Sequence, residues 1–372
     1  MNQKKVSMIL KTLLSYLEGF APLSWQEEYD NSGLIVGNPS QEVHSALISL
    51  DCTEEVVDEA IRLGCNLVIS HHPIVFKGLK RFNGSNYVER VVMKAIKHDI
   101  AIYAIHTNLD NVSGGVNAKI SEKLGLQNTQ ILSPKAGLLK QLVVYVPASH
   151  ANQLRKALFD AGAGGIGNYD ECSFNSSGIG TFTPSAGSDP YSGEIGNAHQ
   201  GEEIRVEVIY PKQVEAALLK AMLENHPYEE VAHNVVQLDN KYQEVGSGMI
   251  GELENPMSEL EFLGFVKNKL KTKVIRHTPF LNKAIKRVAV CGGAGSFLLK
   301  SAIHSAADVF ITGDFKYHEF FDAEDRILIN DIGHFESEQF TQELLLEIIQ
   351  KKFPNFAVRL TEVNTNPINY YF

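Results

Sequence analysis

Three apolar runs in this sequence end in histidine or aspartate, and this feature constrains the fold most. Each run has the composition of a buried strand. In an open α/β sheet the carboxyl ends of parallel strands meet at one edge, where ligands bind, so we expect these polar side chains to converge. The runs and their polar ends are 66–70 with His71 and His72, 101–105 with His106 and Asp110, and 326–330 with Asp331 and His334.

Strand-like and helix-like segments alternate over residues 45–124 and again over residues 287–349. This alternation predicts an α/β main domain with largely parallel sheets covered by helices. Before it, residues 1–23 have the apolar spacing of an amphipathic helix. The expected strands are 45–51, 67–71, 101–105, 287–291, 309–312 and 326–330. The expected helices are 54–63, 87–98, 115–124, 296–304, 316–323 and 336–349.

The middle of the chain follows another order, β-α-β-β-α-β, which is typical of a ferredoxin-like α+β domain. We therefore predict an inserted domain at 137–240 that splits the main domain into 1–133 and 243–372. The connection at 176–200 is rich in Gly, Ser and Pro, and we expect it to be flexible or functional. The elements expected in the insert are 141–146, 151–161, 171–178, 203–210, 213–224 and 231–238.

The composition excludes several classes of protein. The 372 residues include 34 Lys and Arg against 44 Asp and Glu, and this net charge of -10 argues against general binding to nucleic acid. Four scattered cysteines form no CxxC pair, so we expect neither a disulfide framework nor a thiolate zinc site, and a reducing cytoplasm fits best. No segment approaches the roughly 20 apolar residues that a membrane span needs.

The histidine pair is an unusual feature of the first run. Neighbouring side chains on a strand point to opposite faces, so His71 and His72 can share a site only where the strand ends. Pro73 supplies that ending and disfavours helical geometry at His72. The alternative is one buried, hydrogen-bonded histidine and one exposed histidine.

His334 and Glu338 are four residues apart at the start of an expected helix, so both lie on one face. Asp110 follows a strand, where it could bridge metal ions. Taken singly, the helix pair could satisfy the helix end, and Asp110 could cap a turn. Together with the histidine pair, they suit two divalent ions per chain. Imidazole and carboxylate without thiolate fit Zn or Fe, with Mn or Co as alternatives.

Further residues could support this site. Asp314 and His318 are candidate catalytic acid-base groups or could support metal ligands, with helix capping and surface exposure as the alternatives. The glycine-rich run 291–295 could approach an anion or form a tight turn, and its Cys291 is expected to pack. Lys77, Lys80 and Arg81 could meet an anionic substrate or lie in a solvated loop.

With these motifs in order, the sequence resembles the GTP cyclohydrolase I type 2 homolog family, also called NIF-three-like. The first motif commonly has Trp where this chain has Tyr29, which should affect packing more than chemistry. The motifs are Asp30-Asn31-x-Gly33-Leu34, Ser70-His71-His72-Pro73, His106-Thr107-Asn108-Leu109-Asp110, the glycine run with Thr312-Gly313-Asp314, and Gly333-His334-x-x-Ser337-Glu338.

The resemblance implies a dinuclear metal site and a toroidal homo-hexamer with metal sites facing an internal cavity. The segment 226–229 is similar to part of the CutA-like and PII-like folds, which tend to form trimers. We hypothesise that the insert helps to assemble or cap the ring. The ligands implied by the resemblance are His71, His72, Asp110, His334 and Glu338.

Two functions follow as hypotheses. The first is a metal-dependent hydrolase, GTP cyclohydrolase-like, that acts on a nucleotide or a related phosphorylated metabolite. The second is a non-catalytic, metal-binding hexamer with a regulatory or interaction role. Both predict bound metal, but only the first predicts that Glu338→Gln or His71→Ala abolishes turnover while the fold survives.

Overall fold

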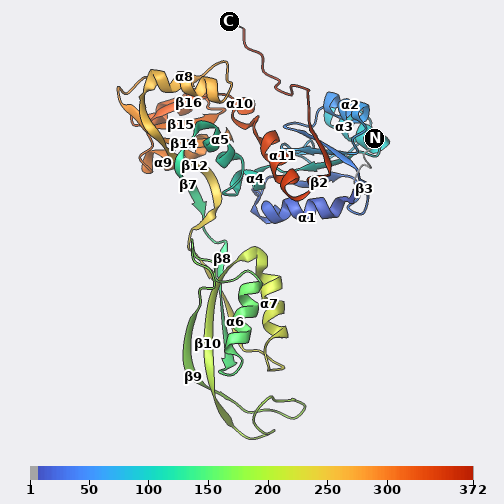
Figure 1. Ribbon diagram of the computed structural model, residues 1–372, viewed down its shortest axis with the longest axis vertical. Helices are drawn as coiled ribbons and strands as arrows, with labels where there is room; N and C mark the ends of the chain where they lie inside the picture. The colour runs from blue at the N-terminus through green and yellow to red at the C-terminus, as the bar shows by residue number, and fades with distance from the viewer. Residues whose placement is uncertain (1–6, 372) are drawn as a thin grey trace. The chain divides into compact units, whose positions relative to one another are not determined.

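The computed structural model describes residues 7–371 and divides into two compact units (Figure 1). The main unit joins the two ends of the chain, up to Pro134 and from Glu244 onward. The insert is the intervening segment Lys135–Gln243. Of the helix expected at 1–23, the structure shows α1 (Leu10–Phe20), whereas residues 1–6 lie outside the described part. No helix within 7–371 is long and apolar enough to cross a membrane.

The first sheet of the main unit has five strands in the order β17-β4-β5-β6-β2. The pairs β17–β4, β4–β5 and β5–β6 are parallel, whereas β2 is antiparallel to β6. Two short strands, β1 and β3, pair separately. The bounds are β1 Met8–Ile9, β2 Gly33–Val36, β3 Glu42–Val43, β4 Ser45–Ser49, β5 Leu67–Ser70, β6 Ala101–Ala104 and β17 Ala357–Leu360.

Helices cover both faces of this sheet because successive strand residues point to opposite sides. On β4, Leu47 packs with α2 and α3, whereas Ile48 packs with α1 and α11. The ends of α2 are set by sequence: the Thr53 side chain accepts a hydrogen bond from the first turn, and Gly64 takes a left-handed conformation. The bounds are η1 Leu23–Trp25, α2 Glu54–Leu63, α3 Tyr87–Lys97, α4 Thr107–Asn111, α5 Val116–Leu124 and α11 Thr341–Lys352.

The second sheet has six strands in the order β13-β16-β15-β14-β12-β7. Its central pairs, β14–β15 and β15–β16, are parallel, whereas β12 pairs antiparallel with β14 and β13 pairs antiparallel with β16. Both sheets are thus mixed. The first keeps the expected largely parallel pairing, with β2 antiparallel at its edge, whereas the second gains antiparallel strands that were not expected. The bounds are β7 Gln127–Lys135, β12 Tyr242–Ser258, α8 Glu259–Lys269, β13 Arg276–His277, β14 Ala284–Ala294, η3 Ser296–Leu298, α9 Leu299–His304, β15 Val309–Gly313, η4 Tyr317–Ala323, β16 Leu328–Asp331 and α10 His334–Glu338.

The helix expected at 336–349 is in fact two helices, α10 and α11. The break falls at Gln339 and Phe340. The Gln339 side chain donates to the Leu270 carbonyl at 2.9 Å, and Phe340 is buried in the core. Tertiary contacts therefore stop the helix that periodicity predicted. The helix expected at 316–323 is the 3-10 helix η4, for which the apolar pattern gives no separate signal.

The insert forms one antiparallel four-stranded sheet, ordered β11-β8-β10-β9, with α6 and α7 packed on it. Its elements follow the expected order β-α-β-β-α-β. The strand expected at 171–178 begins and ends later in the chain, as β9. Its pairing with β10 extends it into the connection expected at 176–200. The loop between the two strands is therefore 183–198. The bounds are β8 Leu139–Pro147, α6 Ala151–Asp160, β9 Phe174–Phe182, β10 His199–Pro211, η2 Lys212–Val214, α7 Glu215–Glu224 and β11 His233–Leu238.

Candidate metal centre

The carboxyl ends of three neighbouring parallel strands bring polar side chains to one edge of the first sheet. Asp51 follows β4, His71 directly follows β5, and His106 follows β6. Strand pairing fixes their spacing, because β4, β5 and β6 lie side by side in parallel register. Asp110 follows one turn after His106, within the short helix α4.

The second sheet supplies the opposite side of the centre through α10. Gly333 has a φ of 95°, which lets the chain turn from β16 into α10. His334 and Glu338 are the first and last residues of this helix and lie one turn apart. Glu338 is almost fully buried, with 3 % of its side chain exposed.

The glycine-rich run after β14 allows close packing against α10. Gly293 has a φ of 63°, and a Cβ atom at this position would collide with the Glu338 carboxylate. The Gly293 amide donates to the Ser337 hydroxyl at 2.9 Å. Of the two interpretations left open, the structure therefore favours the tight turn over an anion cradle.

The five expected metal ligands converge around the Glu338 carboxylate. Its Oε2 lies 3.0 Å from Nε2 of His72 and 3.1 Å from Nε2 of His334. The two Nε2 atoms are 3.3 Å apart. On the other side, Nε2 of His71 lies 3.5 Å from Oδ1 of Asp110 and 3.8 Å from Oε1 of Glu338.

In four histidine rings at the centre, the same nitrogen atom, Nδ1, faces an outer oxygen atom. In each ring Nδ1 lies within hydrogen-bond distance of an oxygen atom, so a donated Nδ1 proton leaves Nε2 with a free electron pair. This arrangement is common for metal-binding histidines, because the outer oxygen fixes both ring orientation and tautomer. The pairs are His71 with the Ile105 carbonyl at 2.8 Å, and His72 with Asp51, His106 with Asp30 and His334 with Asp314 at 2.7 Å.

Two buried atoms at the centre, Nε2 of His71 and Oδ1 of Asp110, make no hydrogen bond to the described residues. Burial and then the nearby charge of Glu338 raise the pKa of Asp110 to about 8. Two crowded carboxylates and an unsatisfied imidazole nitrogen lower their energy by sharing a cation. The residues present therefore fit a divalent metal.

His72 and His334, whose imidazoles lie beside Oε2 of Glu338, bind protons strongly in the metal-free protein. Burial opposes the charged form of His72, but hydrogen bonds to Asp51 and Glu338 outweigh it and raise the pKa to about 10. Burial likewise opposes charge on His334, yet Asp314 and Glu338 raise its pKa to about 11. Burial would raise the pKa of Glu338, but the imidazoles hold it well below its usual range. A metal ion must displace these protons.

Three groups of side chains each place their ligand atoms within 4.8 Å of one another. Adjacent groups share a residue, so the candidate ligands form one continuous cluster. Each group contains nitrogen donors, and the last two groups add carboxylate. The groups are His71, His72 and His106; His72, His334 and Glu338; and His71, Asp110 and Glu338.

Two contributors to this centre, Asp30 and Asp51, were not predicted from the sequence, and a third, His106, was expected at this edge without a ligand role. His106 was not among the expected ligands, although it follows β6 much as His71 follows β5, and that position was the available signal. Asp30 and Asp51 orient His106 and His72. Asp51 ends an expected strand and Asp30 stands in the first motif, but nothing local shows which histidine each contacts.

The two candidate acid-base residues have different surroundings. Asp314 accepts a hydrogen bond from His334, which lowers the pKa of Asp314 and makes it a support for a candidate ligand. His318 is exposed on η4, where its ring contacts Tyr317 and Phe321, and the structure does not bring it into the cluster.

Cys291 and the three basic residues of the loop after β5 differ in burial. Cys291 is buried, and burial raises the pKa of its thiol. This environment fits packing, as expected. Lys77, Lys80 and Arg81 are exposed in the loop after β5.

A cavity of about 200 Å³ adjoins the cluster and contains candidate ligands in its wall. Tyr29 and Phe297 also line it, and both side chains are more than half exposed. Polar lining from Asn117 and Ser247 stands beside them. The cavity therefore combines aromatic faces, polar groups and the candidate metal centre.

The fold and the site define a class: an α/β protein whose two mixed sheets enclose a candidate His and carboxylate metal centre. More specifically, the chain belongs to the Duf34/NIF3 (NGG1p interacting factor 3) family, whose model matches residues 8–367. This membership confirms the resemblance found in the sequence.

Individual relatives match over almost the whole chain. A Bacillus subtilis protein named GTP cyclohydrolase 1 type 2 homolog is 39 % identical over 367 residues, covering 96 % of this chain and 97 % of its own. The solved structure of a Bacillus cereus protein related to NIF3 is 41 % identical with a TM-score of 0.85, covering 99 % of this chain and 100 % of its own. A Staphylococcus aureus structure is 30 % identical with a TM-score of 0.79, covering 98 % and 99 %.

Proposed function

We propose that the main unit binds two divalent metal ions and is a metal-dependent hydrolase acting on a nucleotide or a related phosphorylated metabolite. One observation carries this proposal: imidazole nitrogens from both sheets converge on the carboxylates of Glu338 and Asp110, with buried donor atoms left unsatisfied. When bound, two such ions supply Lewis acidity and activate water for hydrolysis. Zn or Fe suits the donors first, with Mn or Co as alternatives.

Glu338 would help to hold both ions, because its two carboxylate oxygens face different histidines: Oε2 lies 3.0 Å from Nε2 of His72 and Oε1 lies 3.8 Å from Nε2 of His71. Asp110 and His71 would complete one side of the centre, and His72 and His334 the other. Asp51 and Asp314 would hold the latter two rings in place. His106 would add a nitrogen donor beside the first histidine pair.

The adjoining cavity supports a substrate that carries a heteroaromatic ring. The exposed rings of Tyr29 and Phe297 offer stacking surfaces. A base held there would place its reacting atoms beside the candidate metal centre. GTP is the first compound to assay, because the Bacillus subtilis relative is named a GTP cyclohydrolase 1 type 2 homolog.

Elemental analysis of gently purified protein, paired with a nucleotide-hydrolysis screen, tests this proposal. We expect about two ions per chain, with turnover lost in Glu338→Gln and retained in Glu224→Gln, a matched change on the exposed surface of α7 in the insert. Two ions without turnover of any nucleotide would favour the non-catalytic regulatory alternative. Absence of metal after reconstitution would overturn both.

We also propose that the chain forms a cytoplasmic homo-hexamer whose insert helps to assemble or cap the ring. The four free cysteines support a reducing compartment. Light scattering should give about six times the chain mass of 41.2 kDa. The separate core of the insert supports a deletion of residues 135–243 as the assembly test. Unchanged assembly and unchanged access to the metal after deletion would refute the role of the insert.

A further inference from the structure

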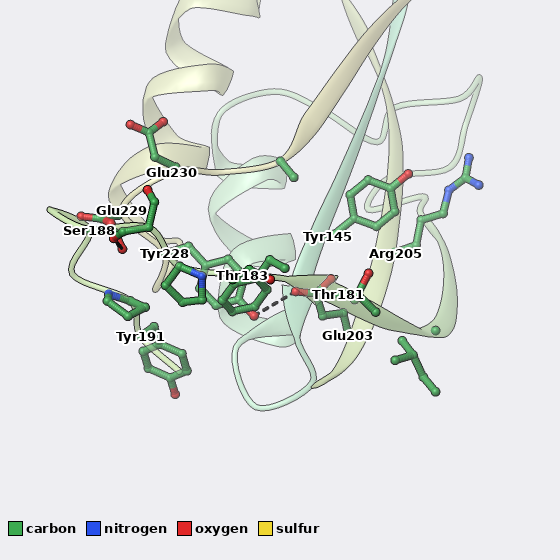
Figure 2. A pocket seen from close by; sticks show the side chains of 18 of the residues that line it. Tyr145, Thr181, Thr183, Ser188, Tyr191, Glu203, Arg205, Tyr228, Glu229 and Glu230 are labelled. Atoms are coloured by element: carbon green, nitrogen blue, oxygen red, sulfur yellow. Dashed lines mark hydrogen bonds between the residues drawn. The ribbon is translucent and has the colours of Figure 1, made fainter. Parts of the chain in front are cut away.

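A second cavity, of about 660 Å³, lies within the insert (Figure 2). Its walls come from β9, β10, the loop 183–198 and the segment that follows α7, and all lining residues fall between Tyr145 and Ala232. This volume is typical of small-molecule sites. Since no candidate metal ligand lines it, it is a separate feature of the protein.

Aromatic rings form one part of its wall. The ring centroid of Tyr228 lies 5.9 Å from that of Tyr191 and 6.3 Å from that of Phe182, with the planes tilted by 45° and 59°. All three rings also line the cavity, so each presents part of its surface to it. Because each aromatic face is negative, the wall attracts a positive group.

A fixed carboxylate lies beside these rings. The Tyr228 hydroxyl donates to Oε1 of Glu203 at 2.9 Å, an interaction drawn in Figure 2. Across the strands, the Glu203 carboxylate occupies the space where a Cβ atom of residue 180 would stand, so Gly180 provides room for it. Burial and then Glu203 raise the pKa of Tyr228 to about 12, which keeps its hydroxyl proton available for donation.

The charge of the lining is negative. Glu229 and Glu230 also line the cavity, against Arg205 as the one lining cation among the described residues. The Arg205 guanidinium is already paired, with its Nε 3.0 Å from Oε1 of Glu207. An anionic ligand would therefore meet an excess of carboxylates, whereas a cationic ligand would balance them.

The loop that carries Tyr191 is held in place at two points. The Asp189 amide donates to the Glu229 carboxylate at 2.8 Å, and the Gly196 amide donates to the Pro184 carbonyl at 2.8 Å. These bonds close the loop 183–198 and connect it to the segment of Tyr228. The rings and the carboxylate are thus arranged before any ligand binds.

We propose that this cavity binds a small organic cation that carries an ammonium or guanidinium group. The cation lies against the rings of Phe182, Tyr191 and Tyr228, and Glu203 balances its charge. Such recognition combines cation–π attraction with a charge-assisted contact. A bare metal ion fits less well, because the ligand-atom clusters found among residues 7–371 all lie at the metal centre and none in the insert.

Calorimetric titration of the full chain with choline, agmatine and 3,3-dimethyl-1-butanol tests the proposal. The butanol has the shape of choline without its charge. We expect both cations to bind and the neutral compound to bind at least about tenfold more weakly. Binding should persist after chelator treatment, because the cavity shares no residue with the metal centre. This separates the proposal from the proposed hydrolase activity.

Amino-acid substitutions test whether the cations bind in this cavity. Glu203→Gln and Tyr191→Ala should each weaken choline binding by about tenfold, and Glu202→Gln, an exposed neighbour outside the cavity lining, should leave it unchanged. Tyr228→Phe keeps the aromatic ring and should retain most of the affinity for choline. It provides a second binding measurement at this cavity if Glu203→Gln does not fold. Equal binding of the neutral compound would overturn the proposal. Binding of inorganic phosphate that Arg205→Ala abolishes, or of zinc ions at this cavity, would also overturn it.

Discussion

At the scale of single residues, an oxygen atom behind each histidine decides what that histidine can do. His72 and His334 each pair Nδ1 with a carboxylate, whereas His71 uses a backbone carbonyl. The paired Nδ1 can donate its proton, so Nε2 faces the centre as a donor atom for a metal. The outer oxygens are therefore as much a part of the centre as the expected ligands.

Removing the partner of His72 should weaken metal binding. We expect Asp51→Ala to lower zinc affinity by about 10- to 100-fold, because the ring loses the group that fixes its tautomer and orientation. Competition with a chromophoric chelator measures this affinity. Asp58→Ala is the matched control, since Asp58 pairs with Lys94 at the surface. Equal affinities of the two variants would contradict the role of Asp51.

The metal-free protein should lose stability as the pH rises. The pKa of His72 is raised from 6.5 to about 10 in the folded state, so its stabilising contribution is complete below pH 6.5 and lost by about pH 10. The raised pKa of His334 has the same sign. Chemical denaturation of chelator-treated protein across this pH window measures the effect. The stability of the metal-loaded protein should not decline in this way. An increase in the stability of the metal-free protein with rising pH would contradict the prediction.

At the scale of elements, the extended segment after β17 joins the two sides of the centre. The Thr365 hydroxyl donates to Oδ2 of Asp51 at 2.7 Å, and the Asn366 amide donates to Glu336 on α10 at 3.1 Å. Asp51 holds His72, and α10 carries His334 and Glu338. This segment therefore supports residues that lie on different sheets.

A shortened chain tests the role of this segment. Ending the protein after Val363 removes both contacts, and we expect zinc affinity to fall by about tenfold because Asp51 and α10 lose support. Ending it after Tyr370 keeps Thr365, Asn366 and the contact of Tyr370 with Glu336, and should preserve most of the affinity. Chelator competition measures both proteins, and circular dichroism checks their folds. An identical loss in the two proteins would argue against these contacts.

The elements also show how much of the fold the sequence could predict. The strand β5 was predictable because it is a short apolar run that stops shortly before Pro73. The helix α2 was predictable because Thr53 can cap its start and Gly64 can end it. The separation of α10 from α11 was not, since contacts of Gln339 and Phe340 with distant residues set it. The antiparallel strands were missed because pairing direction depends on connections that local patterns do not encode.

At the scale of the whole molecule, two units have separate hydrophobic cores. The core of the insert gathers residues of β8, α6, β10 and α7. In the main unit a single cluster contains apolar residues from both sheets, such as Ile48 of β4 and Val309 of β15. The two sheets of the main unit should therefore fold together, and the insert should fold as its own cooperative unit.

Calorimetry should accordingly resolve two unfolding transitions, of which only one depends on metal. A ligand stabilises the unit that binds it, so a hundredfold excess of zinc over its dissociation constant should raise the main-unit transition by roughly 5–10 °C. The transition of the insert should stay in place, and a change of Leu154 to Ala should lower it alone. A single transition that shifts as a whole would show that the two units unfold together.

The sequence indicated which residues could form the metal centre, because strand ends and helix spacing are local patterns that bring the expected ligands to an edge. It also determined that the middle of the chain has a different order of elements. The tertiary structure showed that Asp30 orients His106, that Asp51 orients His72, and that His318 remains exposed. It also formed the cavity of the insert, where Gly180, Glu203 and Tyr228 meet. Such contacts arise between residues far apart in the chain, and their geometry depends on how sheets and helices pack.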